Sequence, residues 1–204
     1  ARNRYLRKAE YRNTDWFKEL FRSSLMHTHS ISLSSGTEKS QYYASMSAMF
    51  DPGWTKASEV ERYTANLNAT YNIFDGLTMH CISRGYYRKQ TAPGTLAATT
   101  DVVFGEVKRD FDINPYSYAM NSSRTLDPDE FYTRNYAPFN ILDELGKNYI
   151  DLNVVDTKFQ AELRYKPVTG LELSALAAIK YSATTQEHNI TDYSNQARAY
   201  RAMA

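Results

Sequence analysis

Four side chains have the chemistry to contact a polar ligand. Arg84, Tyr86 and Arg88 follow one another at two-residue spacing, so a β-strand would place all three on one face. Guanidinium and phenol groups are suited to a glycan or to a peptide carboxylate. Trp54, in a separate stretch, offers a ring for a sugar to stack on. We expect these four residues to be substrate contacts. The alternative is that the arginines pair with neighbouring acids and that Trp54 packs within its loop or is an interfacial anchor.

Other chemistry is poorly supported by the residue types. His27 and His29 have a spacing that would suit two metal ligands on a strand, but no motif places a third ligand beside them. Cys81 is the single cysteine, so no internal disulfide forms, and no motif sets a base beside it. A hydrolase would need a convergent acid pair, which the sequence does not offer. We therefore expect no metal, no cofactor and no enzymatic activity.

The composition excludes some partners and favours others. The 204 residues carry 24 Lys and Arg against 23 Asp and Glu, so no basic excess points to a nucleic acid. The 17 Tyr and 9 Phe are typical of a membrane β-barrel, whose amphipathic rings gather at the headgroup level, and also of a glycan-binding sandwich. A mean hydropathy of -0.60 suits both classes.

The elements that must position these residues are strands. Odd positions from 61 to 73 are mostly Tyr, Ala and Leu, whereas the even positions between them are polar, as in a strand with one apolar face. Asp75-Gly76 then predicts a tight hairpin into a strand over 77–88. Two further pairs of alternating runs follow the same pattern: 30–34 with 42–50, joined by 35–38, and 158–165 with 171–183, joined by 166–170. We predict about six strands in three hairpins.

The strand and loop lengths indicate a membrane-spanning barrel. About ten residues per strand match a tilted strand that crosses a bilayer. The connections alternate between short turns near 36, 75 and 168 and longer segments at 51–61 and 89–156. Short periplasmic turns and long extracellular loops are the layout of outer-membrane barrels. The predicted fold class is therefore all-β, an antiparallel transmembrane β-barrel segment with a long extracellular loop.

The segment 89–156 is too long for a plain loop and should carry structure of its own. Asp127-Pro128-Asp129-Glu130 predicts a helix start, and 140–145 and 16–21 predict short helical turns. The long loop is rich in aromatic residues, and we expect it to fold over the barrel mouth. These residues are Phe111, Tyr116, Tyr118, Phe131, Tyr132, Tyr136 and Phe139.

The order of several short motifs resembles the barrel of SusC/RagA-type TonB-linked outer-membrane transporters. Asn13-Thr14-Asp15-Trp16-Phe17 is similar to the box that follows the plug domain in that family, and Ser35-Gly36 with a restart at Tyr42-Tyr43-Ala44-Ser45 is similar to its first hairpin. The likeness continues in the long loop with Asn114-Pro115-Tyr116-Ser117 and Tyr136-Ala137-Pro138-Phe139-Asn140. It covers residues from about 11 to 184.

The resemblance implies an organisation and a set of partners. Residues 1–26 would be a lead-in after the plug with a short helix, 27–184 a partial β-barrel, and 185–204 the start of a further extracellular loop. We expect the chain to be part of a longer protein of the bacterial cell outer membrane, in contact with its lipid. Partners would be a SusD-like lipoprotein and, through a plug outside these residues, the TonB-ExbB-ExbD complex. The resemblance implies import of oligosaccharides or peptides.

The alternative function is that of a soluble all-β glycan-binding module. Such a module also has alternating strands and many tyrosines. Its strands should be shorter, and a second sheet should bury one face of the first. Strand length, and whether a second sheet buries one face of the first, therefore distinguish the alternatives.

Overall fold

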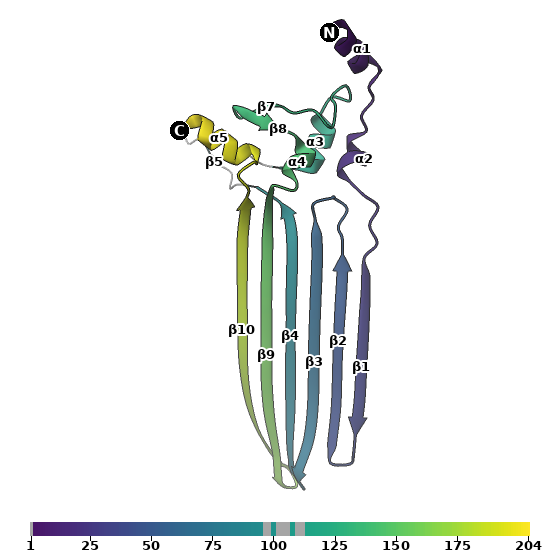
Figure 1. Ribbon diagram of the computed structural model, residues 1–204. Helices are drawn as coiled ribbons and strands as arrows, with labels where there is room; N and C mark the ends of the chain where they lie inside the picture. The colour runs from purple at the N-terminus through teal and green to yellow at the C-terminus, as the bar shows by residue number, and fades with distance from the viewer. Residues whose placement is uncertain (1, 96–98, 101–106, 109–112) are drawn as a thin grey trace.

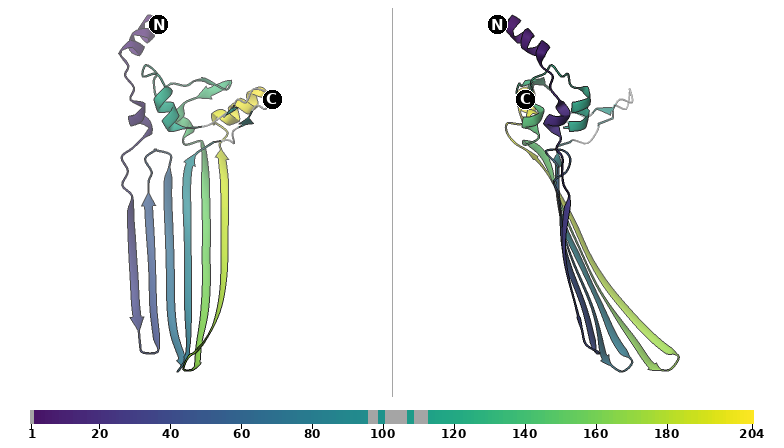
Figure 2. Two further views of the ribbon diagram at one scale, coloured as in Figure 1. Left: turned by 180° about the vertical axis from the view of Figure 1, so that it is seen from behind. Right: turned by 90° about the vertical axis from the view of Figure 1, so that its right-hand side faces the viewer.

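The computed structural model describes residues 2–95, 99–100, 107–108 and 113–204. A tall antiparallel sheet carries a smaller cap of helices and short strands at one end (Figure 1). Viewed from the side, the sheet is twisted, and the cap and both chain ends lie beyond the same end of the strands (Figure 2).

The large sheet contains six strands in the order β1-β2-β3-β4-β9-β10. All neighbours are antiparallel, and the three predicted hairpins are confirmed as β1-β2, β3-β4 and β9-β10. The strand bounds are β1 His27–Gly36, β2 Ser40–Asp51, β3 Glu59–Phe74, β4 Leu77–Pro93, β9 Asn148–Val168 and β10 Leu171–Ile190.

Two of the short turns depend on glycine. Gly76 (φ 91°) and Gly170 (φ 90°) occupy the left-handed region, which glycine adopts without steric cost. A Cβ on Gly76 would also approach the carbonyl oxygen of Lys166 to 2.7 Å. The Asp75-Gly76 turn is as predicted. The expected five-residue turn at 166–170 was wrong: β9 continues through Val168, so Thr169 and Gly170 alone form the turn.

Several strands are longer than the predicted ten residues. β3 has 16 residues, β4 has 17, β9 has 21 and β10 has 20. The expected loop at 89–156 is therefore wrong at both ends, because β4 and β9 stay paired up to Pro93 and Tyr149. The expected loop at 51–61 likewise shortens, since β2 ends at Asp51 and β3 begins at Glu59.

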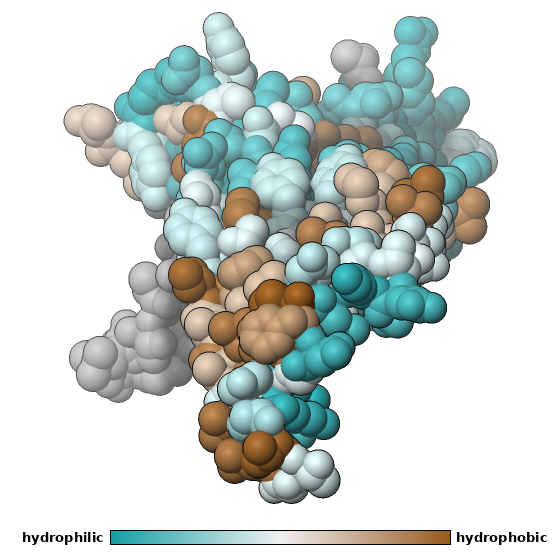
Figure 3. Space-filling model, turned by 90° about the horizontal axis from the view of Figure 1, so that it is seen from below, coloured by the Kyte–Doolittle hydropathy of each residue, from teal (hydrophilic) through white to brown (hydrophobic). Residues whose placement is uncertain are grey.

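One face of the sheet is apolar and exposed. The register aligns Ala44, Leu67, Phe159 and Ile179 in one row across the strands. Leu67 is 47% exposed and Phe159 is 50% exposed although both lie on central strands, so no other element in the described part of the chain covers them. Seen from the turn end, apolar side chains gather on one side of the lower hairpins and polar side chains on the other (Figure 3).

The cap holds the main buried hydrophobic cluster of the described residues. Its core comprises Trp16, Leu20, Ile113, Ala119, Phe139, Ile141 and Leu145. The contributing elements are α2 Trp16–Leu20, α3 Pro115–Asn121, β8 Ala137–Phe139 and α4 Ile141–Glu144. The remaining elements are α1 Arg2–Tyr11, β5 Thr99–Thr100, β6 Val107–Lys108, β7 Tyr132–Arg134 and α5 Asn195–Met203. None of the described helices is long and apolar enough to span a bilayer.

The helical predictions are confirmed at two places and wrong at a third. α2 begins after Asp15, whose carboxylate accepts from the Phe17 and Lys18 amides, and α4 begins after Asn140 in the same way. Asp127 to Glu130 instead form a turn, in which the Glu130 amide donates to the Asp127 carbonyl at 3.3 Å. Aspartate followed by proline suits the first positions of a turn as well as those of a helix.

The ends of the chain are more structured than expected. The lead-in at 1–26 contains two helices, α1 and α2, where one short helix was predicted. The segment 185–204 is not a plain loop, because β10 continues to Ile190 and α5 follows. Of the aromatic residues predicted to order the long loop, Phe139 is buried and Tyr118 packs against the core, whereas Phe111 lies outside the described residues.

Candidate functional site

The second face of the sheet is polar, and it carries three of the four predicted contact residues. Arg84, Tyr86 and Arg88 occupy alternate positions of β4. Arg84 is paired with Lys158, and Tyr86 with Asp156. Because paired residues of an antiparallel sheet point to the same side, these side chains share one surface. The prediction that Arg84, Tyr86 and Arg88 share a face is confirmed.

Cross-strand hydrogen bonds tie the polar face together. Asn66 donates to the Ser45 hydroxyl at 3.3 Å, and the Thr70 hydroxyl lies 2.7 Å from Nδ1 of His80. The Ser47 and Thr64 hydroxyls are also in contact. Such pairs stabilise neighbouring strands, and they make this face compatible with contact to water or to another polar surface.

A depression of about 440 Å³ on the polar face is dominated by positive charge. Arg84, Lys158 and Lys180 line it together with Asp156. The Lys180 ammonium group lies 3.1 Å from Asp156 Oδ2. A lining of three cations and one carboxylate is suited to a ligand that brings negative charge.

Sequence reasoning missed Lys158 and Lys180 as members of this site. Both alternate with apolar neighbours in the predicted strands, so their face could be read from the sequence. Their place beside Arg84 could not, because it depends on the pairing of β4 with β9 across the long connection.

Arg88 lies two rows closer to the cap than Arg84. Its partner on β3 is Arg62, so two guanidinium groups are directly opposed. Within the described residues, Nε of Arg88 is buried without a hydrogen-bond partner, as is Oδ1 of Asn68 on the same face. Buried polar atoms are normally satisfied, so these two atoms are exceptions on the polar face.

Trp54 lies apart from the other predicted contacts, so the four residues do not form one site. The Trp54 ring stacks on Phe21 at 5.1 Å between centroids, and it lies 6.5 Å from Tyr116. Phe17 joins the cluster through Phe21 and Tyr116. Trp54 remains 61% exposed. The structure thus places it in an aromatic cluster where the cap meets the β2-β3 loop.

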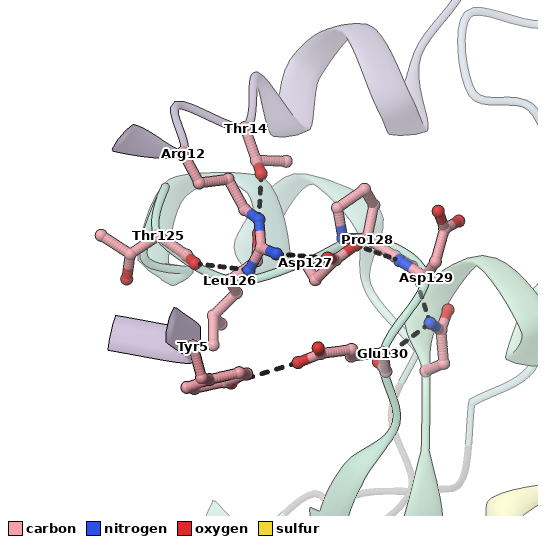
Figure 4. Close-up of polar contacts among 10 residues, drawn as sticks. Tyr5, Arg12, Thr14, Thr125, Leu126, Asp127, Pro128, Asp129 and Glu130 are labelled. Atoms are coloured by element: carbon pink, nitrogen blue, oxygen red, sulfur yellow. Dashed lines mark hydrogen bonds and ion pairs between the residues drawn. The ribbon is translucent and has the colours of Figure 1, made fainter. Parts of the chain in front are cut away.

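The cap is fastened to the N-terminal segment by polar contacts (Figure 4). Arg12 forms an ion pair with Asp127 and donates to the Thr125 carbonyl at 3.2 Å. Thr14 donates to the Leu126 carbonyl at 2.7 Å, and Trp16 Nε1 donates to the Ser123 carbonyl at 3.0 Å. The anchor for residues 12–16 is therefore the segment 123–127, which ends at the first residue of the turn that was predicted as a helix start.

α5 is docked on the cap by a buried polar network. Asn195 donates through Nδ2 to the carbonyls of Arg134 and Ala137, at 2.8 and 3.1 Å. Its backbone amide donates to Oε1 of Glu144 at 2.5 Å. Burial raises the pKa of the Glu144 carboxyl group, and the amide of Asn195 opposes that rise. The buried side chain thus joins α4 to the start of α5.

The two neighbouring histidines of β1, His27 and His29, lie beside each other and beside an aromatic ring. The rings of His27 and His29 are 5.1 Å apart, and His27 also contacts Phe50. Among the described residues, no group of three or more His, Cys, Asp or Glu side chains is placed to hold a metal ion.

Comparison with known proteins finds relatives that are much longer than this chain. No protein-family model matches it. TonB-dependent receptor SusC of Bacteroides thetaiotaomicron is 27% identical over 195 residues, a match that covers 89% of this chain and 19% of SusC. The chain therefore spans about one fifth of the length of this relative.

Solved structures share the fold. The RagAB peptide importer in its closed-closed state superposes with a TM-score of 0.68 at 18% identity, covering 89% of this chain and 20% of that one. The open-open state gives a TM-score of 0.64 at 19% identity, covering 84% and 19%. These relatives are receptors and transporters rather than enzymes. The chain is homologous to a segment of the SusC/RagA-type TonB-dependent receptors, and its six-stranded sheet matches part of their barrel.

Proposed function

We propose that the chain forms part of the wall and the extracellular cap of a TonB-dependent transporter in the bacterial outer membrane. The observation that carries the proposal is the contrast between the two faces of the sheet. One face is apolar and exposed on every strand, whereas the other carries arginines, lysines and hydrogen-bonded polar side chains. A barrel wall has lipid on one side and a polar interior on the other.

The competing proposal of a soluble glycan-binding module is disfavoured by the same sheet. Strands of 16 to 21 residues exceed the usual length of about 5–6 residues in globular sheets. In the described part of the chain, the other two sheets have two strands each, too small to cover the apolar face. An exposed apolar surface of this extent would promote aggregation in water.

The arrangement of the connections suggests the sidedness. The turns near 36, 75 and 169 lie at one end and would be periplasmic, whereas the cap at the other end would be extracellular (Figure 1). Residues 1–26 would lead in from a plug domain, through which TonB-ExbB-ExbD acts. A SusD-like lipoprotein would close over the cap.

The imported compound would be an oligosaccharide or a peptide. A peptide is supported by RagAB, which is named a peptide importer. Trp54 would meet the substrate at the cap, and Arg84, Tyr86 and Arg88 would meet it within the barrel. Tyr86 and the arginines offer hydrogen-bond donors, and the exposed Trp54 ring offers a stacking surface.

A loop deletion in the full-length transporter tests the role of the cap. Residues 112–145, which include α3, β7, β8 and α4, would be replaced by a short Gly-Ser linker. We expect loss of uptake or of co-purification of the lipoprotein, with the barrel still inserted, as judged by heat-modifiable mobility. Trp54→Ala serves as a second variant, since its exposed ring can be removed without opening the cap core. Unchanged uptake and unchanged co-purification in the deletion variant would contradict the proposal.

A further inference from the structure

The helix α1 carries a row of positive charges along one side. Arg4, Arg7 and Lys8 are three or four residues apart or adjacent, so they share one face of the helix, which we call the cationic face. All three side chains are exposed, and Tyr11, on the same face, is 87% exposed. The face lines a surface depression of about 760 Å³, whose other lining residues are Asn3 and Arg12.

The helix is held in place from another side. The Tyr5 hydroxyl, which lies off the cationic face, donates to Oε2 of Glu130 at 3.1 Å (Figure 4). Arg12, directly after the helix, pairs with Asp127. These contacts fasten α1 to the turn at 127–130 of the cap and leave the cationic face open to solvent.

The described residues do not neutralise the cationic face. Among them, Arg4, Arg7 and Lys8 form no ion pair, and Glu10 is the one acid of α1. Like charges three and four residues apart destabilise a helix, and arginines in its first turn oppose the helix dipole. Because α1 buries none of its residues, packing does not offset this repulsion. An anion bound to the face would offset it.

The position of α1 distinguishes between possible anions. α1 lies beyond the cap and away from the strands in every ribbon view (Figures 1 and 2), whereas lipid headgroups would lie beside the strand ends. A stable protein interface has a core depleted of charged residues. The cationic face offers three adjacent charges and one aromatic ring instead. These properties favour a small, soluble, acidic compound over a lipid or a protein surface.

We infer that the cationic face of α1 is a capture site for an acidic compound, and that the imported compound is an oligosaccharide or peptide with neighbouring carboxylates. The inference rests on the proposed transport function. Arginine binds a carboxylate through two parallel hydrogen bonds. Residues three apart on a helix have Cβ atoms about 5–6 Å apart, so Arg4 and Arg7 can hold successive carboxylates of one chain. The Tyr11 ring offers a stacking surface beside them.

Binding to the full-length transporter in lipid nanodiscs tests the inference. The probes would be oligogalacturonate and oligoglutamate, with methyl-esterified oligogalacturonate and oligoglutamine as their neutral counterparts. We expect at least one acidic probe to bind with an affinity that falls as salt is added, and its neutral counterpart to bind far more weakly. The two acidic probes distinguish a saccharide from a peptide. Binding of neither acidic probe would overturn the inference.

A pair of charge removals locates the site on α1. Arg4→Gln combined with Arg7→Gln keeps good helix formers and should weaken binding of the acidic probe roughly tenfold, with a smaller salt dependence. The matched control combines Lys18→Gln with Lys56→Gln, which removes the same charge from exposed positions of α2 and the β2-β3 loop. The control should bind almost as the parent does. Equal weakening in both variants would overturn the capture site.

Hydrogen exchange in the parent protein decides the matter even if the double variant does not insert. The amides of residues 2–11 should exchange more slowly when the acidic probe is added, and not when its neutral counterpart is added. Protection confined to other segments would overturn the inference and leave the transport function standing. Loss of the lipoprotein from the double variant, with no probe bound to the parent, would assign α1 to a protein partner instead. Failure of the parent itself to insert would contradict the proposed function.

Discussion

Glu144 is a carboxyl group that is only 2% exposed, between α4 and the start of α5. Its contact with the Asn195 amide stabilises the ionised form, but burial has the larger effect and raises its pKa above the ordinary value of 4.5. A raised pKa means that the folded protein holds this proton more tightly than the unfolded protein does. The contribution of Glu144 to stability is therefore full below pH 4.5 and is lost as pH rises through the raised value.

Replacement of Glu144 by glutamine should remove this pH dependence. The glutamine side chain would keep an oxygen that accepts from the Asn195 amide, and it has no charge to bury. With a spin label at Met203→Cys in a Cys81→Ser background, we expect the mobile fraction of α5 to grow with rising pH in the parent. The glutamine variant should show a flat profile. The same pH-dependent rise in both proteins would exclude Glu144 as its source.

The residue types on β4 predicted a shared face but not the complete site. Two-residue spacing is sufficient to align Arg84, Tyr86 and Arg88, because strand geometry fixes it. The surroundings of Trp54 could not be predicted from the sequence, because its neighbours Phe21 and Tyr116 come from distant segments. The helix start that combines a capping side chain with a following proline was also predicted at the wrong place. It was predicted at Asp127 and Pro128, whereas Asn114 and Pro115 begin α3.

At the scale of elements, the hairpins could be predicted and the strand ends could not. Between Tyr63 and Ile73, apolar residues alternate strictly with polar residues, so this strand is plain in the sequence. Nearer the cap, Lys89 and Asn153 are paired on what is the apolar face lower down. The alternation of β9 is inverted there, because Ile150, Leu152 and Val154 lie on the face that is polar lower down, while the backbone ladder of β4 and β9 continues to Pro93.

A pair of neighbouring substitutions on β3 tests the assignment of its faces. Leu67 lies near the middle of the apolar face, and Asn68 lies on the polar one. Leu67→Arg should cost about 2–4 kcal/mol of folding free energy if lipid contacts this position. Asn68→Arg should cost much less. Equal losses of folding free energy in a titration of the full-length barrel would contradict the prediction that lipid contacts the face of Leu67 and not the face of Asn68.

At the scale of the whole molecule, the apolar band has the height of a bilayer interior. Tyr63 to Ile73 of β3 span about 33 Å at about 3.3 Å per residue, or about 23 Å along the membrane normal at a tilt of about 45°. Aromatic rings mark both limits. Phe50, Tyr63 and Tyr87 form a contact series at the cap side, and Phe74 meets Tyr165 at the turn side. Such girdles are expected at the two membrane interfaces.

The most direct test of the account is lipid contact along β3 in the full-length protein. Single cysteines from Glu59 to Phe74 would each carry a fluorophore, in a Cys81→Ser background, in bilayers whose acyl chains are brominated. We predict strong quenching at odd positions from Tyr63 to Ile73, weak quenching at the even positions between them, and little quenching at Glu59 and Glu61. Equal quenching on both faces, or none on the odd face, would contradict the assignment of this sheet to a membrane-spanning barrel wall.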